Sequence, residues 1–265
     1  MNPELESVLA RYPRLRNIIG KVPDDLVAAE VLPSVRDYEA IKPEATRLIR
    51  LSNLCDVFPP EAERGRIDLV DFLGQWGNVS VEELCKICLV VKWLDPRGIF
   101  EIGTHNGLST MQMALNAPNA MVYTLDIKPD SPEAAALDIG GIDRYLAQKA
   151  GVFKFDVGHK FAGTEVARRI RQLWGDSTTF DFKPYEGRCN VVFIDAGHTY
   201  EYVKSDTERA VRLLDPLRDG AILWHDYDQV LHPDVTRCLC DFARGGTEIH
   251  HLRNTNLAIH RQRKR

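Results

Sequence analysis

The sequence predicts an α/β protein: a doubly wound, mostly parallel sheet of seven strands with helices on both faces and a helical N-terminal extension. The first supporting observation is that, from residue 80 onward, short apolar runs alternate with helical patterns of about ten to fifteen residues. The second is that these runs are almost continuously apolar, as in strands buried on both faces. The third is that glycine, aspartate or histidine follows several of them, where ligands bind in such folds.

Each expected element is bounded by residues that start or stop it. Ser80 and Glu83 form a capping box that begins a helix, and Asp95-Pro96 ends it. The expected strands are 98–102, 121–126, 152–156, 190–195 and 221–224, with two weaker ones at 248–252 and 257–260. The expected helices are 81–94, 108–115, 131–150, 164–174, 201–214 and 234–243.

The N-terminal part has a different character. Residues 1–75 favour helix but contain several prolines, which predicts short helices and loops. We expect this extension to serve as a lid or a dimerisation arm, and hence a homo-oligomer. Residues 76–265 form the predicted catalytic domain.

Composition limits the possible partners. The 265 residues are 44% hydrophobic and 27% charged, with a net charge of −4, as in a soluble globular protein. No basic stripe predicts a nucleic-acid partner, and no apolar run is long enough to span a membrane. The start of the chain lacks a signal-peptide pattern, so we expect a cytoplasmic protein with reduced cysteines. Cys85 and Cys88 have zinc-site spacing, but their helical context favours core packing.

A glycine loop follows the first strand of this domain. Its pattern is E-x-G-x-x-x-G, in which glycines allow a sharp turn and a close approach to a ligand. The amides of the next helix N-terminus can bind a polar group. The candidate cofactor-binding residues here are Glu101, Gly103, Thr104, His105, Asn106, Gly107 and Ser109.

Further cofactor contacts are expected at the next two strand ends. Asp126 ends the second strand and is placed to accept both ribose hydroxyls of an adenosine, with Ile127 on the adenine face. Asp156 is expected at the end of a third strand, where it would accept from the adenine amino group, with Val157 donating its backbone N–H.

The loop favours S-adenosylmethionine over a dinucleotide. A dinucleotide loop reads G-x-G-x-x-G, whereas His105 takes the middle glycine position and would crowd a pyrophosphate. No G-K-[ST] follows, which excludes a Walker loop. Dinucleotide binding and a purely structural turn remain the alternatives.

Three motifs in order resemble a known family. Residues 100–110 (FEIGTHNGLST) resemble motif I of class I S-adenosylmethionine-dependent methyltransferases. With residues 193–200 (FIDAGHTY) and 220–227 (GAILWHDY), the chain is similar to the macrocin-type group of natural-product O-methyltransferases. Ala196 and Asp219 depart from that group's usual glycines. The resemblance implies a Rossmann-like methyltransferase fold, O-methylation of a small-molecule hydroxyl, and a metal at the strand ends.

The candidate reaction residues end the fourth and fifth strands. In one mechanism Asp195 and Asp226, with or without His225, bind a divalent cation such as Mg²⁺, which activates the acceptor hydroxyl. In the other, His198 is the general base; the two can coexist. Asp195 could instead cap a helix or bond the cofactor's amino group, and His225 could be structural.

Two aromatic residues and two other functions complete the sequence predictions. Trp224 and Tyr227 flank the cluster and are candidate contacts of an aromatic or sugar acceptor, with core packing as the alternative for Trp224. A nicotinamide-dependent oxidoreductase and a non-catalytic adenosylmethionine-binding protein are the competing functions.

Overall fold

The computed structural model describes residues 3–16, 22–73, 77–129, 131–132, 134, 145 and 156–264. Its centre is an eight-stranded sheet in the order β1-β7-β8-β6-β5-β2-β3-β4. All neighbouring strands pair in parallel except that β8 is antiparallel to β6 and β7. The strands are β1 (Arg50–Ser52), β2 (Gly98–Ile102), β3 (Met121–Asp126), β4 (Ile170–Trp174), β5 (Val191–Ile194), β6 (Gly220–Trp224), β7 (His250–Leu252) and β8 (Ala258–Gln262).

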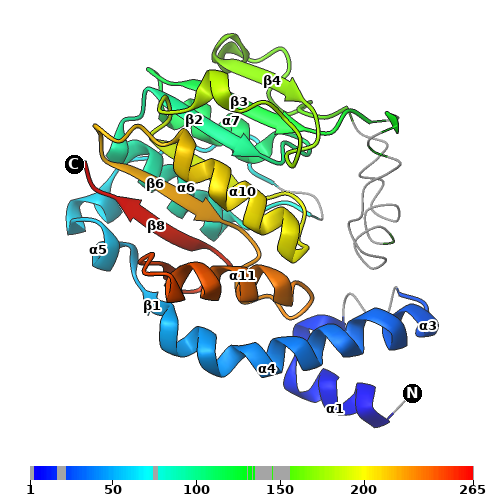
Figure 1. Cartoon of the computed structure of the whole chain (residues 1–265). Helices are drawn as coiled ribbons and strands as arrows, with labels where there is room; N and C mark the ends of the chain where they lie inside the picture. Colours follow the sequence, from blue (N-terminus) through cyan, green and yellow to red (C-terminus); the bar gives the residue numbers. More distant parts are fainter. Residues whose placement is uncertain are drawn as a thin grey trace.

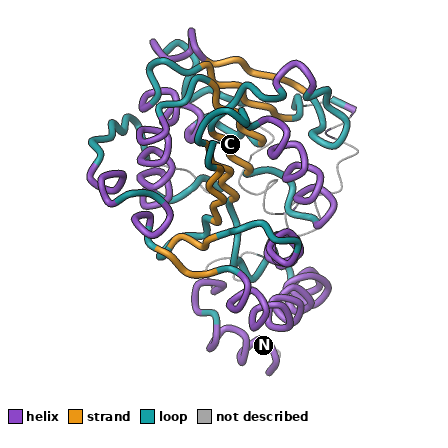
Figure 2. The backbone as a smooth tube through the Cα atoms, turned by 60° about the vertical axis from the view of Figure 1, so that its left-hand side comes forward, coloured by secondary structure: helices purple, strands orange, loops and turns teal. Residues whose placement is uncertain are grey.

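Helices cover both faces of this sheet (Figures 1 and 2). One face packs against α5 (Leu54–Val57), α6 (Val81–Leu94) and α7 (Leu108–Asn116). The other packs against α10 (Tyr200–Leu213) and α11 (Pro233–Arg244). The doubly wound, mostly parallel fold predicted from the sequence is therefore confirmed, with one strand more than the seven expected.

The N-terminal helices form a layer of their own beneath α11 (Figure 1). They are α1 (Pro3–Arg11), α3 (Asp24–Leu26) and α4 (Leu32–Leu48), with a π-helical turn at Val27–Val31 between the last two. Their apolar residues form a small core of their own, which Val230 and Leu231 of the loop after β6 also join. The N-terminal helices thus contact a loop that follows one of the predicted reaction residues.

The N-terminal segment differs from the prediction in two ways. Helix α4 runs for 17 residues with Pro43 inside it, because packing along α11 outweighs the local cost of the proline. Residues 50–52 form β1, which pairs with β7 and supplies the eighth strand. The three residues of β1 are too few to give a periodic signal.

The elements nearest the site formed largely as predicted. Ser80 caps α6, since its hydroxyl accepts from Glu83 N at 3.3 Å and the Glu83 carboxylate accepts from Ser80 N at 2.7 Å. The helix ends at Asp95, which adopts a left-handed conformation. All five residues of β2 and all five of β6 are buried.

The third strand of this half was predicted in the wrong place. The expected helix 164–174 is a 3₁₀ turn (Glu165–Arg169) followed by β4, which pairs with β3 at the edge of the sheet. Pairing with β3 satisfies the β4 backbone, and this tertiary interaction overrides the weak helical pattern. Of the expected strand 152–156 only Asp156 is described, and it lies in no strand; the expected helix 131–150 falls almost entirely outside the described residues.

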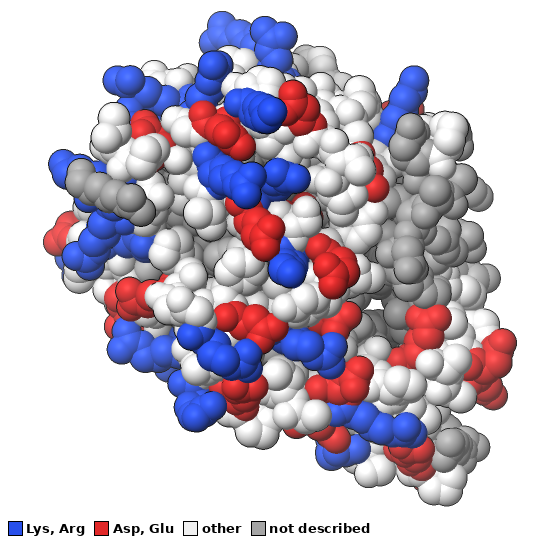
Figure 3. Space-filling model, in the orientation of Figure 1, with Lys and Arg blue, Asp and Glu red and all other residues white. Residues whose placement is uncertain are grey.

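The surface carries charges of both signs. On the face shown in Figure 3, basic and acidic side chains are interspersed, with no large area of one sign. Among the described residues, no helix combines the length and apolar character needed to cross a bilayer.

Candidate active site

The register of the parallel strands collects the candidate residues along one edge of the sheet. Ile102 of β2 lies level with Leu125 of β3 and Ile194 of β5, and Ile194 lies level with Trp224 of β6. The residues that follow are Gly103, Asp126, Asp195 and His225, so the four strand-end residues come together at the carboxyl edge. Strand β2 is also where the order of the sheet reverses, the usual place for a ligand crevice.

The glycine loop needs its glycines for steric reasons. Gly103 has φ +100°, and a Cβ placed there would lie 1.9 Å from the backbone carbonyl oxygen of Asp195. Gly107 has φ +83°, and its Cβ would lie 2.6 Å from the Phe161 ring. Gly103 therefore allows the loop and the end of β5 to meet directly.

Asp126 lies beside this loop, as predicted. Its carboxylate accepts from Thr104 N at 3.0 Å, His105 N at 2.7 Å and Ile127 N at 2.7 Å. Burial raises the pKa of Asp126 to about 6, although the three amides favour its charged form. A carboxylate accepts about four hydrogen bonds, so the three from described residues leave one position for a hydroxyl such as that of a ribose, where the sequence led us to expect two.

Glu101 and Ser109 lie beneath the loop rather than at its surface. Glu101 is fully buried and accepts hydrogen bonds from the hydroxyls of Ser109 (2.6 Å), Thr124 (2.6 Å) and Thr110. Burial raises the pKa of Glu101 to about 7, against the opposing effect of the three hydroxyls. In this structure these side chains support the loop from below.

The middle of the loop is held by its neighbours. Asn106 is fully buried, and its amide exchanges hydrogen bonds of 3.0 and 2.9 Å with the amide of Asn78. Thr104 is also buried, with its hydroxyl 2.6 Å from that of Thr124. His105 adopts φ +49° and contacts Asn78 at 3.2 Å, and burial lowers the pKa of its ring. The loop therefore presents mainly backbone groups.

The prediction that Asp156 and Val157 lie at the end of the third strand is wrong. These residues begin a turn that packs on the glycine loop, where Gly158 N donates to His105 O at 2.9 Å and Lys160 N donates to Asn106 O at 2.9 Å. They do not follow the third strand, because that strand is β4. The residues that do follow it are Gly175, Asp176 and Ser177, which the sequence analysis missed.

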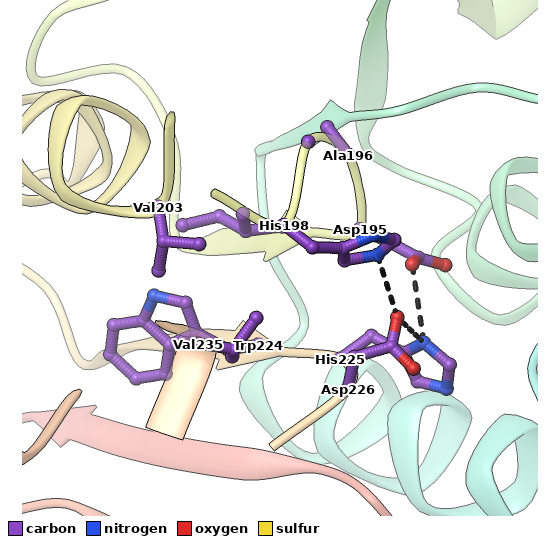
Figure 4. Close-up of a pocket in the computed structure, with 10 residues that line it drawn as sticks. Asp195, Ala196, His198, Val203, Trp224, His225, Asp226 and Val235 are labelled. Carbon is purple, nitrogen blue, oxygen red and sulfur yellow. Dashed lines mark hydrogen bonds and ion pairs between the residues drawn. The ribbon is translucent and has the colours of Figure 1, made fainter. Parts of the chain in front are cut away.

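The four predicted reaction residues lie close together and point toward one another (Figure 4). His225 Nδ1 is 3.2 Å from Asp195 Oδ1 and 3.0 Å from Asp226 Oδ2. His198 Nε2 is 2.9 Å from the same Asp226 oxygen. All four line one pocket, together with residues at the ends of β5 and β6.

The charges of this cluster stabilise one another. Burial disfavours a charged His225, but the carboxylates of Asp226 and Asp195 outweigh it and hold the pKa of His225 well above its usual value. Burial likewise disfavours a charged Asp226, yet His225 and His198 hold its pKa well below the usual range. Asp226 has φ +57°, so its backbone adopts the left-handed region in order to place this side chain.

Two further residues of this cluster were not predicted to belong to it. Glu83 was interpreted only as a helix cap, but its carboxylate is also 3.4 Å from His225 Nε2. Burial opposes ionisation of Glu83, while His225 and two backbone amides lower its pKa to about 2. His232 stacks on His198 with ring centroids 3.9 Å apart. No local sequence pattern links either residue to this cluster, because the fold brings both to it from distant elements.

Several side chains that the sequence analysis considered for a functional role are core residues in the structure. Trp224 is 1% exposed and donates from Nε1 to Thr207 Oγ1 at 2.9 Å. Tyr227 is 2% exposed and packs edge-on against His251. Cys88 is fully buried within α6, and burial raises the pKa of its thiol to about 12. Trp224 and Cys88 follow the packing alternative, whereas Tyr227 was predicted to contact the acceptor and is instead buried in the core.

The doubly wound sheet and the strand-end site together are those of a Rossmann-like fold, in which ligands bind at this edge of the sheet. Residues 100–227 match a protein family described as "Methyltransferase domain". This range contains the glycine loop, Asp126 and the His/Asp cluster. Together these findings support a class I S-adenosylmethionine-dependent methyltransferase. No curated protein matches the chain.

Several solved structures are similar in fold. The O-methyltransferase NovP has a TM-score of 0.53 at 15% identity, over 70% of this chain and 81% of that one. The O-methyltransferase TomG from Streptomyces achromogenes has a TM-score of 0.47 at 16% identity, over 80% and 94%. An O-methyltransferase from Bacillus cereus has a TM-score of 0.45 at 18% identity, over 78% and 94%.

Proposed function

We propose that this chain transfers a methyl group from S-adenosylmethionine to the hydroxyl of a small molecule, as in macrocin-type natural-product O-methyltransferases, with the help of a divalent cation. The observation that carries the proposal is the contact between two halves of the site. The glycine loop meets the backbone of Asp195 at Gly103, and the side chain of Asp195 belongs to the His/Asp cluster. A methyl-donor site and a site for removing a proton thus share one edge of the sheet.

On the donor side, bound S-adenosylmethionine supplies the electrophilic methyl group. Asp126 is placed to hold the ribose, since it lies at the end of β3 with one acceptor position left beside the loop amides. Gly175 N donates to Asp126 O at 3.0 Å, which brings the residues after β4 to the same edge. We therefore include Ser177 with Asp126 and Ile127 as candidate adenosine contacts.

On the acceptor side, His198 is the proposed general base. A carboxylate only accepts hydrogen bonds, so His198 Nε2 donates to Asp226 and the basic lone pair lies on Nδ1. Asp226 would stabilise the imidazolium that forms when His198 takes the proton, in the way that an orienting aspartate does in hydrolase triads.

The donor set also fits a divalent cation. Asp195, His225 and Asp226 each offer one ligand atom, and all three atoms lie within 4.8 Å of one another. A cation bound there would lower the pKa of the acceptor hydroxyl and orient it.

The donor assignment is tested by calorimetric titration of the purified chain with S-adenosylmethionine and, separately, with NAD. We expect S-adenosylmethionine to bind and Asp126→Ala to weaken it at least tenfold, whereas Asp37→Asn, an exposed acid on α4, leaves it unchanged. Binding of NAD without S-adenosylmethionine would favour the oxidoreductase and overturn the proposal.

The reaction is tested by following S-adenosylhomocysteine release with a panel of small-molecule hydroxyl acceptors. We expect turnover that EDTA suppresses and that Asp195→Ala or Asp226→Ala abolishes. Full turnover in EDTA would remove the cation from the scheme while leaving the donor assignment intact. Binding of S-adenosylmethionine without product from any acceptor would instead support a non-catalytic binding protein.

A further inference from the structure

The surroundings of His225 differ on the two sides of its ring, and the difference bears on which cation the cluster accepts. On one side Nδ1 faces two carboxylate oxygens, at 3.2 Å on Asp195 and 3.0 Å on Asp226. Neighbouring ligands around one ion, each about 2.1 Å from it, are themselves roughly 3 Å apart. The two distances from Nδ1 are therefore short enough for adjacent ligands of a single cation, and all three ligand atoms lie within 4.8 Å of one another.

On the other side, His225 Nε2 lies 3.4 Å from Glu83 Oε2. The Glu83 carboxylate is fixed there, because it also accepts from Ser80 N at 2.7 Å and Asn256 N at 2.8 Å. Glu83 is 3% exposed, so little water competes for it. A carboxylate that accepts from one ring nitrogen leaves the lone pair of the other directed at a metal, and it makes that nitrogen a stronger ligand.

We infer that Asp195, His225 and Asp226 form a site for a first-row transition-metal ion, selected over Mg²⁺, and that Glu83 is the positioning residue that holds His225 as its nitrogen ligand. This inference rests on the divalent cation of the proposed function. It adds the class of the ion and a residue outside the ligand set.

The chemistry of the donor set supports the choice of ion. Mg²⁺ prefers an octahedron of oxygen ligands and retains water, whereas imidazole nitrogen suits ions such as Co²⁺, Zn²⁺ and Fe²⁺. The carboxylates of Glu83, Asp195 and Asp226 lie on both sides of the His225 ring within a mostly buried cluster. His198 and His232 place two more imidazole rings beside Asp226, which makes the surroundings richer in nitrogen donors.

The test measures cation binding directly, without substrate. The full-length chain is freed of metal with EDTA, returned to metal-free buffer, and titrated calorimetrically with CoCl₂ and with MgCl₂, while the visible absorption of Co²⁺ reports nitrogen coordination. We expect Co²⁺ to bind the wild type at least 100-fold more tightly than Mg²⁺. In His225→Asn, which keeps an oxygen donor, that ratio should fall at least tenfold and the Co²⁺ spectrum should change.

Glu83→Gln tests the positioning role. We expect it to weaken Co²⁺ binding by about 10- to 100-fold with little effect on Mg²⁺. Glu248→Gln is the matched control, because Glu248 also lies beside a histidine Nε2, that of His250 at 3.1 Å, but the Nδ1 of His250 contacts the Ser52 hydroxyl at 2.9 Å. This control should bind Co²⁺ like the wild type. A thermal melt reports whether Glu83→Gln is folded. If it is not folded, the change in the ratio of Co²⁺ to Mg²⁺ affinity in His225→Asn tests the inference instead.

Three results would overturn the inference: no binding of either ion, an equal Co²⁺ to Mg²⁺ ratio in the wild type and His225→Asn, or wild-type Co²⁺ binding by folded Glu83→Gln. If neither ion binds, the contacts of His225 with the three carboxylates are an ion-pair network without a metal. Titration of the same sample with S-adenosylmethionine separates these failures from a failure of the proposed function, since the proposed adenosine contacts Asp126 and Ile127 are not among the proposed metal ligands.

Discussion

Gly103→Ala tests whether the contact between the glycine loop and β5 holds the site together. A methyl group there would lie 1.9 Å from Asp195 O, whereas real Cβ contacts are almost never shorter than 3.0 Å. One of the two backbones must therefore move by about 1 Å or more. The matched control is Gly246→Ala, because Gly246 has φ +98°, against +100° for Gly103, and its Cβ would meet nothing within 4 Å.

Both variants share the cost of placing alanine at positive φ, about 1–2 kcal/mol. Gly103→Ala in addition strains the hydrogen bonds Gly103 N to Leu125 O and Asp195 N to Ile102 O, both 2.9 Å. Each is worth about 0.5–1.5 kcal/mol. At roughly 2–4 °C per kcal/mol for a domain of this size, Gly246→Ala should lower Tm by about 2–8 °C. Gly103→Ala should lower it by at least about 2 °C more.

The functional difference should be larger than the stability difference. A loop shift that loses one charge-assisted hydrogen bond to S-adenosylmethionine costs about 1.5 kcal/mol or more, which is at least a tenfold weaker Kd. We therefore expect calorimetry to show this loss for Gly103→Ala and no change for Gly246→Ala. Equal melting temperatures and equal Kd values for the two variants would refute the reasoning.

Three further predictions follow from buried contacts. Glu101 has a pKa of about 7 in the fold and about 4.5 when exposed, so the native state binds more protons between these values. Stability should accordingly fall as pH rises from about 4.5 to 7, by up to about 3 kcal/mol, and urea unfolding of Glu101→Gln should lack this component. Thr207→Val removes the partner of the buried Trp224 N–H and should cost about 1–3 kcal/mol in the same assay, whereas Thr207→Ser should not. Tyr38→Phe removes a 2.8 Å hydrogen bond between α4 and Asp228 in the loop after β6, and should cost about 0.5–1.5 kcal/mol in the same assay.

The sequence sufficed for the elements that build the crevice. Strands β2, β3, β5 and β6 are apolar runs bounded by turn residues, and parallel pairing then requires their carboxyl ends to meet. The proximity of Asp126, Asp195, His225 and Asp226 to the glycine loop follows from that geometry. The site was predictable because its residues come directly after strongly patterned strands.

The parts that were not predictable depend on pairing or on distant contacts. Strand β4 lies at the edge and is only partly buried, so its sequence carries no continuous apolar run. Because the third strand was expected at 152–156, the adenine contacts were assigned to Asp156 and Val157. Ser177, which follows β4, was therefore not considered. His232 enters the cluster from the loop before α11, and no local pattern marks the stacking of its ring on His198.

Glu83 shows how one residue can satisfy a local rule and a site at once. As a cap, it needs only Oε2 to accept from Ser80 N, and the capping box accounts fully for its presence at that position. Its Oε1 nevertheless accepts from Asn256 N, and Oε2 also faces His225. The same carboxylate thus joins the start of α6, the turn before β8 and the end of β6. Because a complete local explanation existed, nothing in the sequence called for a second one, and only the packing of three distant segments discloses it.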